Sequence, residues 1–195
     1  MAIAYIGTET VINGATVTIP VGTTIAIAYE GRLSGGAAIG TPSLTGTPMS
    51  IAANSSDIVG IYYVDSPASG TYTLSNVPDS CVFLYLSGTN GIRAGALASS
   101  TPTSPLATTI PSSIDDFLIL TGRAQSGTNY YNISSMTVDG AAVTYINAYF
   151  NGYKQSSGDS PNIGMVFSYD ALYYCVVSVK SLVASDQSTF MTMIV

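Results

Sequence analysis

The stretches Thr18-Ile19-Pro20 with Gly31-Arg32, and Thr109-Ile110-Pro111 with Gly122-Arg123, occur at one spacing, since 109 − 18 and 122 − 31 both give 91. Between these anchors each copy carries an apolar run typical of a buried strand, at residues 23–29 and 114–120. The period is far longer than the roughly 20 to 50 residues of solenoid and propeller repeats. The spacing therefore predicts two related halves built around a turn that leads into a buried strand.

Weaker matches continue the repeat with growing offsets, as loop insertions would produce. Ser43-Leu44-Thr45-Gly46 corresponds to Thr137-Val138-Asp139-Gly140, where 140 − 46 is 94, and Gly60–Asp65 corresponds to Gly164–Asp170, where 164 − 60 is 104. A last apolar strand is expected to close each half, at residues 81–86 and 172–177. Each copy would then contain several short strands in the same order.

Short apolar runs bounded by turn residues recur along the whole chain. Such runs, rich in β-branched and aromatic residues and separated by Gly, Pro, Asn and Ser, predict an all-β fold, an antiparallel β-sandwich. Ser66-Pro67-Ala68-Ser69-Gly70 is a turn sequence because proline fixes φ and glycine tolerates positive φ. We expect it to join Ile61–Val64 and Thr71–Leu74 as a hairpin.

The small, proline-bearing segment Ala98–Pro105 divides the chain into halves of about 1–98 and 106–195. It has the composition of a linker or of a long crossover within one sandwich. Each half offers few strands with which to bury both sides of its sheets. We therefore predict one domain over residues 1–195, with two small sandwiches as the alternative.

Composition argues against several classes of partner. Five basic and eleven acidic residues give a net charge of −6, and the basic ones are scattered, whereas binding to nucleic acid needs a clustered basic patch. No run approaches the roughly 18 apolar residues of a membrane-spanning helix. The N-terminal residues 1–7 lack the basic and long apolar regions of a signal peptide, so we expect the product to be made and retained in a cytoplasm.

The residues offer little catalytic chemistry. The chain has no histidine, which removes the commonest general base and most zinc sites. Adjacent Asp115 and Asp116 would point to opposite faces of an extended segment, and we expect a solvated strand entrance there. No phosphate-loop or calcium-loop spacing occurs. We predict a protein that is not an enzyme, with no catalytic, cofactor-binding or metal-ligating residue, and with Cys81 and Cys175 as buried thiols rather than a disulfide.

Two apolar or aromatic segments are the predicted interaction sites. The first is a tyrosine-rich region with Gly and Asn neighbours, in which tyrosine rings would suit sugar stacking or a protein interface. The second is the C-terminal segment 190–195, which would be an aggregation hazard if exposed and should pair in its own sheet or in a neighbour's. The predicted interaction residues are Tyr130, Tyr131, Tyr149, Tyr153, Phe190, Met191 and Met193.

The segment Gly60–Leu74, with its short Thr/Val strands and the terse apolar strand after it, resembles a β-sandwich module common in virion proteins of tailed bacteriophages and related bacterial surface proteins. The resemblance implies a jelly-roll-like sandwich that serves as a capsid decoration subunit or other virion building block. The low charge fits this role independently, because the cores of protein interfaces are depleted of charge.

The predicted function is thus that of a non-enzymatic virion structural protein, most simply a capsid decoration or cement subunit. It would form homo-oligomers and bind a protein shell, without cofactors, nucleic acid or membrane, in virions assembled in the host cytoplasm. The alternative is a glycan- or receptor-binding module of a tail fibre or surface adhesin, with tyrosines as the stacking platform.

Overall fold

The computed structural model describes residues 3–32, 37–78, 80–102, 104–146 and 151–182. These residues form antiparallel strands joined by turns and loops, in agreement with the predicted all-β sandwich. Within that part of the chain there is no helix long and apolar enough to cross a bilayer.

The first half is a jelly roll, a long hairpin of strands in which the first pairs with the last and each inner pair nests inside the outer one. The nested pairs are β1 with β9, β2 with β8, β3 with β7 and β4 with β5. They form one large sheet in the order β1-β9-β3-β7-β6 and one small sheet in the order β2-β8-β4-β5. The strands are β1 (Ala4–Ile12), β2 (Thr16–Ile19), β3 (Ile25–Gly31), β4 (Ser43–Leu44), β5 (Thr47–Pro48), β6 (Ser50–Ser55), β7 (Val59–Asp65), β8 (Gly70–Ser75) and β9 (Ser80–Ser87).

The second half repeats this topology strand for strand, which confirms the prediction of two related, jelly-roll-like halves. Its nested pairs are β11 with β20, β12 with β19, β13 with β18 and β15 with β16. β10 (Thr89–Ile92) and β14 (Asn129–Tyr131) are additions that pair with β20 and β13. The remaining strands are β11 (Leu97–Thr101), β12 (Leu106–Thr109), β13 (Phe117–Ser126), β15 (Ser135–Val138), β16 (Ala141–Ala142), β17 (Thr144–Tyr145), β18 (Asn151–Gln155), β19 (Asn162–Val166) and β20 (Ala171–Ser181).

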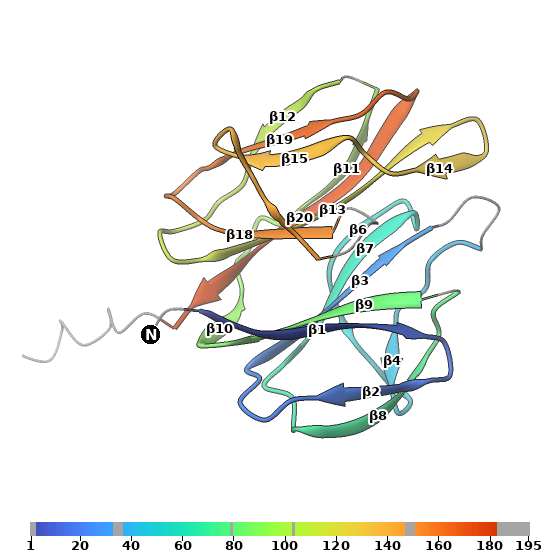
Figure 1. Ribbon diagram of the computed structural model, residues 1–195, viewed down its shortest axis with the longest axis vertical. Helices are drawn as coiled ribbons and strands as arrows, with labels where there is room; N and C mark the ends of the chain where they lie inside the picture. The colour runs from blue at the N-terminus through green and yellow to red at the C-terminus, as the bar shows by residue number, and fades with distance from the viewer. Residues whose placement is uncertain (1–2, 33–36, 79, 103, 147–150, 183–195) are drawn as a thin grey trace, which may run out of the picture.

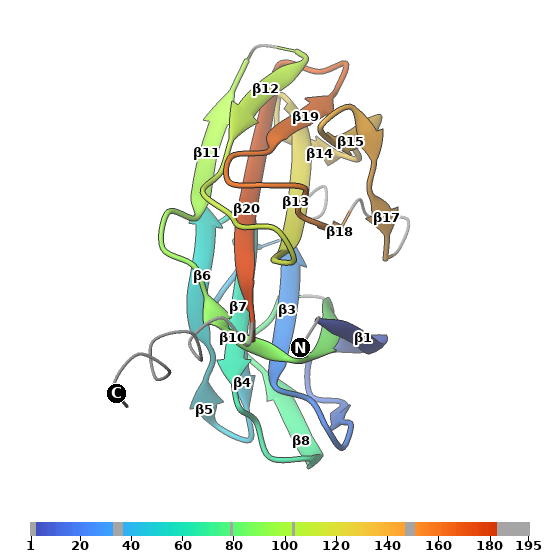
Figure 2. The same ribbon diagram turned by 90° about the vertical axis from the view of Figure 1, so that its left-hand side faces the viewer.

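The two jelly rolls are stacked through their large sheets, so the molecule has four sheet layers along its long axis (Figure 1). Each jelly roll encloses its own core between its large and small sheet. A third core lies between the two large sheets and takes residues from β3, β7 and β9 on one side and from β13 and β20 on the other. In Figure 2 the long strands run up the picture, and β20 and β13 of the second jelly roll meet β7 and β3 of the first.

The apolar run of β3 is explained by burial on both faces. Ile25, Ile27 and Tyr29 point into the central core, and the small residues Ala26 and Ala28 point into the first jelly roll's own core. A strand that is covered on both sides needs no polar alternation. The large side chains thus face the other half, and alanines leave room for the small sheet.

Two of the matches between the halves hold at the level of single residues. Ile19 and Ile110 each lie buried in the core of their own jelly roll. Thr45-Gly46 and Asp139-Gly140 each form the two-residue turn of a hairpin, with positive φ at both positions, +47° and +82° in the first and +49° and +75° in the second. Positive φ at both central residues is the signature of a type I′ turn.

Other matches are wrong in register. A spacing of 91 pairs Ile27 with Leu118, but Ile27 faces the central core and Leu118 faces the core of the second jelly roll. A slip of one residue moves a strand's side chains to the opposite face of the sheet. The matched pairs Gly31-Arg32 and Gly122-Arg123 are therefore not at equivalent positions in the two halves. Gly60 lies in β7 and Gly164 in β19, which are not counterparts either.

Two further expectations are corrected by the strand pairing. β7 and β8 do not form a hairpin, because β7 belongs to the large sheet and β8 to the small one, and residues 66–69 arch between the sheets. The segment Ala98–Pro105 is not the join between the halves, because most of β11 lies within it and pairs with β20. The second jelly roll therefore begins before residue 98, and the join lies between β9 and β11.

Candidate functional site

Two equivalent turns, one in each jelly roll, hold an aliphatic side chain out into solvent. In the turn before β3, the Thr23 amide donates to the Pro20 carbonyl at 3.4 Å, and in the turn before β13, the Asp116 amide donates to the Ser113 carbonyl at 3.1 Å. The second residues of these turns are Val21, 86% exposed, and Ile114, 66% exposed. We call Val21 and Ile114 the tip residues. Turn positions normally carry polar residues or glycine, so an aliphatic tip in both copies is unusual.

Both turns are tied to the same short segment, β10 and its next residue. At the start of β10 the Thr89 hydroxyl lies 2.7 Å from the Thr24 hydroxyl, and just after β10 the Arg93 guanidinium pairs with the Asp116 carboxylate at 2.7 Å. Thr24 follows the first turn and Asp116 ends the second. Both turns are therefore anchored to β10, the first at its start and the second just after its end.

The Asp116 carboxylate organises the second turn. Besides Arg93, it accepts hydrogen bonds from the Ser113 amide at 3.0 Å, the Ser178 hydroxyl at 3.0 Å and the Ser181 amide at 3.1 Å. Asp116 is 1% exposed. The expected solvated strand entrance is therefore wrong for this residue, because the carboxylate joins β10, the turn and β20 from inside the protein.

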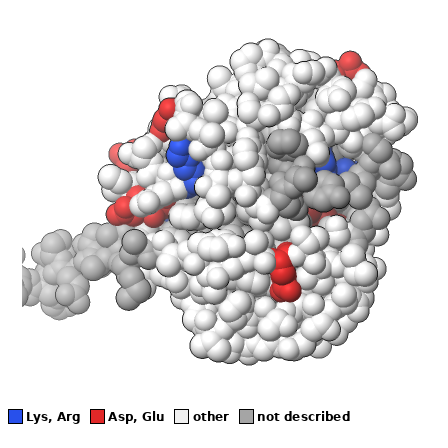
Figure 3. All heavy atoms as spheres, viewed as in Figure 1, with Lys and Arg blue, Asp and Glu red and all other residues white. Residues whose placement is uncertain are grey.

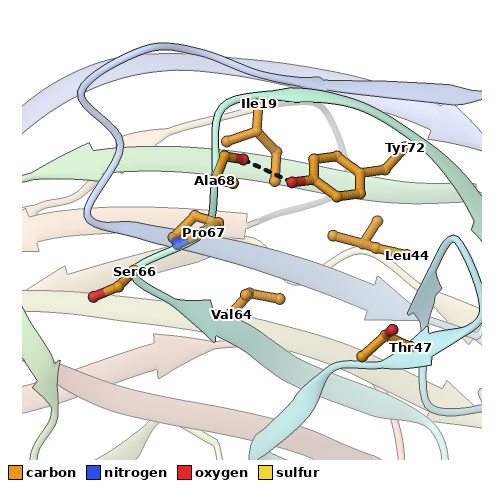
Figure 4. Close-up of a pocket in the computed structure, with 8 residues that line it drawn as sticks. All are labelled: Ile19, Leu44, Thr47, Val64, Ser66, Pro67, Ala68 and Tyr72. Atoms are coloured by element: carbon orange, nitrogen blue, oxygen red, sulfur yellow. Dashed lines mark hydrogen bonds between the residues drawn. The ribbon is translucent and has the colours of Figure 1, made fainter.

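The first jelly roll has an apolar pocket at one end, between its two sheets (Figure 4). Its volume is about 290 Å³. The Tyr72 hydroxyl donates to the Ala68 carbonyl at 2.8 Å and so ties β8 to the arch between β7 and β8 beside the cavity. The lining residues are Ile19, Leu44, Thr47, Val64, Ser66, Pro67, Ala68 and Tyr72.

In the second jelly roll, residues 156–161, which link β18 to β19 as residues 66–69 link β7 to β8, are fastened down. The Ser156 amide donates to the Asp116 carbonyl at 2.8 Å, and the Ser112 amide donates to the Asp159 carbonyl at 3.0 Å. The Asp139 carboxylate accepts from the Ser157 hydroxyl and from the Asn162 amide, and these bonds lower the pKa of Asp139. Pro161, the last residue of this link, is buried.

The described tyrosines of the predicted interaction site lie in three separate places. Tyr130 lies against Arg32, whose guanidinium carbon is 5.1 Å from the ring centroid. Tyr131 stacks on Tyr169 with ring centroids 4.2 Å apart. Tyr153 stacks between Phe117, at 5.1 Å, and Tyr5 of β1, at 5.7 Å, and so links the two jelly rolls at the edge of the central core.

The other predicted interaction residues, Tyr149, Phe190, Met191 and Met193, lie outside the described residues. The tip residues and the pocket were missed by the sequence prediction. A signal for the tips was present, since Pro20-Val21-Gly22 is a turn sequence with an aliphatic residue at its centre. The sequence carries no comparable signal for the pocket, because its lining comes from strands that are far apart in the sequence, namely β2, β4, β5, β7 and β8.

The exposed charges of the described residues are few and acidic. Figure 3 shows a face that is largely uncharged, with several red groups gathered beside a blue one at the left edge and few charges elsewhere. Glu30, Asp116 and Arg123 are buried, and the described lysines and the other arginines are partly buried. The exposed charged side chains are those of Asp57, Asp65, Asp139, Asp159 and Asp170. Within the described ranges, no three His, Cys, Asp or Glu side chains lie together in a group that could hold a metal ion.

Both cysteines are free and buried, which confirms their interpretation as buried thiols. Cys81 lies in the first jelly roll's own core and Cys175 in the central core, where its thiol donates to the Val59 carbonyl at 3.4 Å. Burial raises the pKa of the Cys175 thiol to about 12 and that of the Cys81 thiol well above its ordinary value. Neither thiol forms the reactive thiolate near neutral pH.

We expect the native protein to be inert to a thiol reagent such as dithionitrobenzoate at pH 8. After unfolding in guanidinium, both thiols should react at once. The measurement is the released chromophore with and without denaturant. Stoichiometric reaction of the native protein within minutes would contradict the burial of Cys81 and Cys175.

Comparison of the chain with protein-family models, curated proteins and solved structures finds no match.

Proposed function

We propose that the chain is a non-enzymatic structural protein that associates with copies of itself and with a protein shell, as a capsid decoration subunit of a bacteriophage does. The observation that carries the proposal is the exposed aliphatic tip at the same place in both jelly rolls. The duplicated turn presents two equivalent apolar contacts, Val21 and Ile114, from one rigid body.

The cost of exposing these tips favours a role in binding. Burying a valine or isoleucine side chain is worth roughly 1.5–3 kcal/mol, whereas a serine at a turn loses nothing by facing water. The turns are fixed by backbone hydrogen bonds and by β10, so little conformational entropy is lost when a partner covers them. Two tips anchored to the same strand can then add their contributions.

The low surface charge supports the same role. The described cations are all at least partly buried, and the exposed carboxylates are separate from one another in the sequence. Interface cores are depleted of charged residues, and a lack of repelling charges allows identical surfaces to meet. Jelly rolls are used in viral capsids, but also in lectins and cupins, so the fold by itself decides nothing.

The test is the double variant Val21→Ser/Ile114→Ser, studied by sedimentation velocity across a range of protein concentrations. We expect the parent chain to self-associate and the double variant to do so at least tenfold more weakly, because roughly 1.5–3 kcal/mol of burial is lost at each tip. Co-sedimentation with purified phage shells should weaken in parallel. Thermal stability should change little, since both side chains are exposed.

The matched control is Ile12→Ser/Val166→Ser, which removes two exposed aliphatic side chains elsewhere on the molecule. This control should associate like the parent chain. Equal association of the tip variant and the parent would refute the role of the tips, and a parent chain that stays monomeric at every concentration would refute self-association. Binding of an oligosaccharide by the monomer, lost in Tyr131→Ala, would favour a glycan-binding module instead.

A further inference from the structure

The two jelly rolls differ most clearly at one end, where the first has an apolar pocket and the second has a link held by hydrogen bonds. We propose that the pocket of the first jelly roll is the docking site of the chain's own C-terminal segment, residues 190–195, with Met191 and Met193 entering the cavity. This docking does not depend on the assembly role of the tip residues.

The described chain ends beside β9, two strand spacings from the pocket residue Ser66. The Leu182 amide donates to the Gly88 carbonyl at 2.8 Å, directly after β9. The Thr24 amide donates to the Leu86 carbonyl of β9, and the Ser66 amide donates to the Thr24 carbonyl, both at 2.8 Å. Ser66 therefore lies two strand spacings from β9, a distance of about 10 Å. Ser66 belongs to the pocket rim.

The remaining chain is long enough to reach the pocket. Residues 183–195 number 13, since 195 − 182 is 13, and an extended chain of that length spans at most about 43 Å. A tether several times longer than the gap gives its end a high effective concentration at a site on the same molecule. The chain's own segment therefore competes favourably with that of a neighbouring copy.

The chemistry of the segment fits the lining of the pocket. In an extended strand Met191, Met193 and Val195 point to one side, which is entirely apolar. Methionine is flexible and fills irregular apolar gaps. The cavity presents Ile19, Leu44 and Val64, together with the ring of Tyr72, and has room for more than one such side chain at about 290 Å³. The side chains of residues 187–195 carry no charge that would have to be desolvated.

The experiment uses the full chain with methyl-labelled methionine and a nitroxide attached to a cysteine at the pocket rim, Thr47→Cys. The native thiols are buried and should not take the label. The matched control is Ala141→Cys, because Ala141 opens β16 as Thr47 opens β5 in the first jelly roll, and both residues are exposed. We expect the Met191 and Met193 methyl signals to lose most of their intensity with the label at residue 47 and to keep it with the label at residue 141.

A mixing experiment distinguishes docking of the chain's own segment from docking of the same segment of a neighbouring copy. Spin-labelled Thr47→Cys protein without isotope is mixed with isotope-labelled parent chain, and the methionine signals should then keep their intensity. Strong broadening in this mixture would overturn the proposal in favour of exchange between copies. Unchanged Met191 and Met193 signals in the singly labelled sample would overturn it as well.

A second pair of variants tests the contact without a label. Met191→Ala/Met193→Ala should shift the methyl resonances of Leu44 and Val64, while Thr192→Ala, on the other side of the extended segment, should leave them in place. Shifts of equal size in both variants, or in neither, would refute the assigned side of the segment.

Discussion

Asp116→Ala lowers the free energy of unfolding by about 3 kcal/mol, near the lower end of the range for breaking a buried ion pair. We expect a value at the lower end because the side chain of Arg93 is 31% exposed and can recover hydration when its partner is removed. The side chain of Asp116 is only 2% exposed. The substitution also leaves the amides of Ser113 and Ser181 without their acceptor. The measurement is chemical denaturation of the parent and the variant.

Asp115→Ala is the matched control for this prediction. Asp115 is adjacent but partly exposed, and its carboxylate accepts a hydrogen bond from the Gln155 side chain at 2.9 Å at the surface. We expect a loss of roughly 1–2 kcal/mol, below that of Asp116→Ala, because a surface polar contact is lost and alanine is disfavoured at the φ of +73° of Asp115. Asp116→Asn keeps the shape of the side chain but removes its charge. It should lower the free energy of unfolding by most of the amount expected for Asp116→Ala. Similar stabilities for Asp115→Ala and Asp116→Ala would mean that Asp116 does not organise the turn.

The fold could be predicted where a feature is local or repeated. Short apolar runs separated by turn residues were sufficient for the all-β class. The repeat also matched Thr45-Gly46 with Asp139-Gly140, which the structure shows to be equivalent hairpin turns. The nested pairing could not be read in this way, because the partners of β1 and β11 lie at the far ends of their halves. The arch of residues 66–69 has the composition of a hairpin loop, and only the sheets at its two ends show otherwise.

The functional features were harder to predict, because they depend on contacts between distant residues. Asp116 looked like half of a solvated pair, and its partner Arg93 is 23 residues away with no motif to connect them. The described tyrosines are close in sequence but contact Arg32, Tyr169 and Tyr5, which belong to different parts of the fold. Val21 was visible as an apolar residue in a turn sequence, whereas Ile114 was expected to begin the buried strand at 114–120. The structure instead begins β13 at Phe117 and places both turns beside β10.

Leu84→Ala should have the largest effect of any single aliphatic truncation on both halves at once. Leu84 is fully buried in the central core, where β9 lies beside Ile27 of β3 and the large sheet packs against Ile119 and Val177 of the second jelly roll. Leucine-to-alanine changes in such sites cost 2–5 kcal/mol, from lost transfer free energy and the cavity left behind, and we expect about 3 kcal/mol here. Val166→Ala, at a residue 42% exposed, should cost less than about 0.5 kcal/mol.

The same variant tests the prediction that residues 1–195 are one domain. Met49 is buried in the first jelly roll's core, and Met136 and Met165 in the second's, so their methyl signals report on each half separately during a urea titration. Because unfolding either half would expose its side of the central core, we expect the three signals to be lost at one midpoint, and Leu84→Ala to lower that midpoint equally for all. A variant in which Met49 unfolds early while Met136 and Met165 keep the parental midpoint would mean that the jelly rolls are independent and that the central core is an interface between two domains.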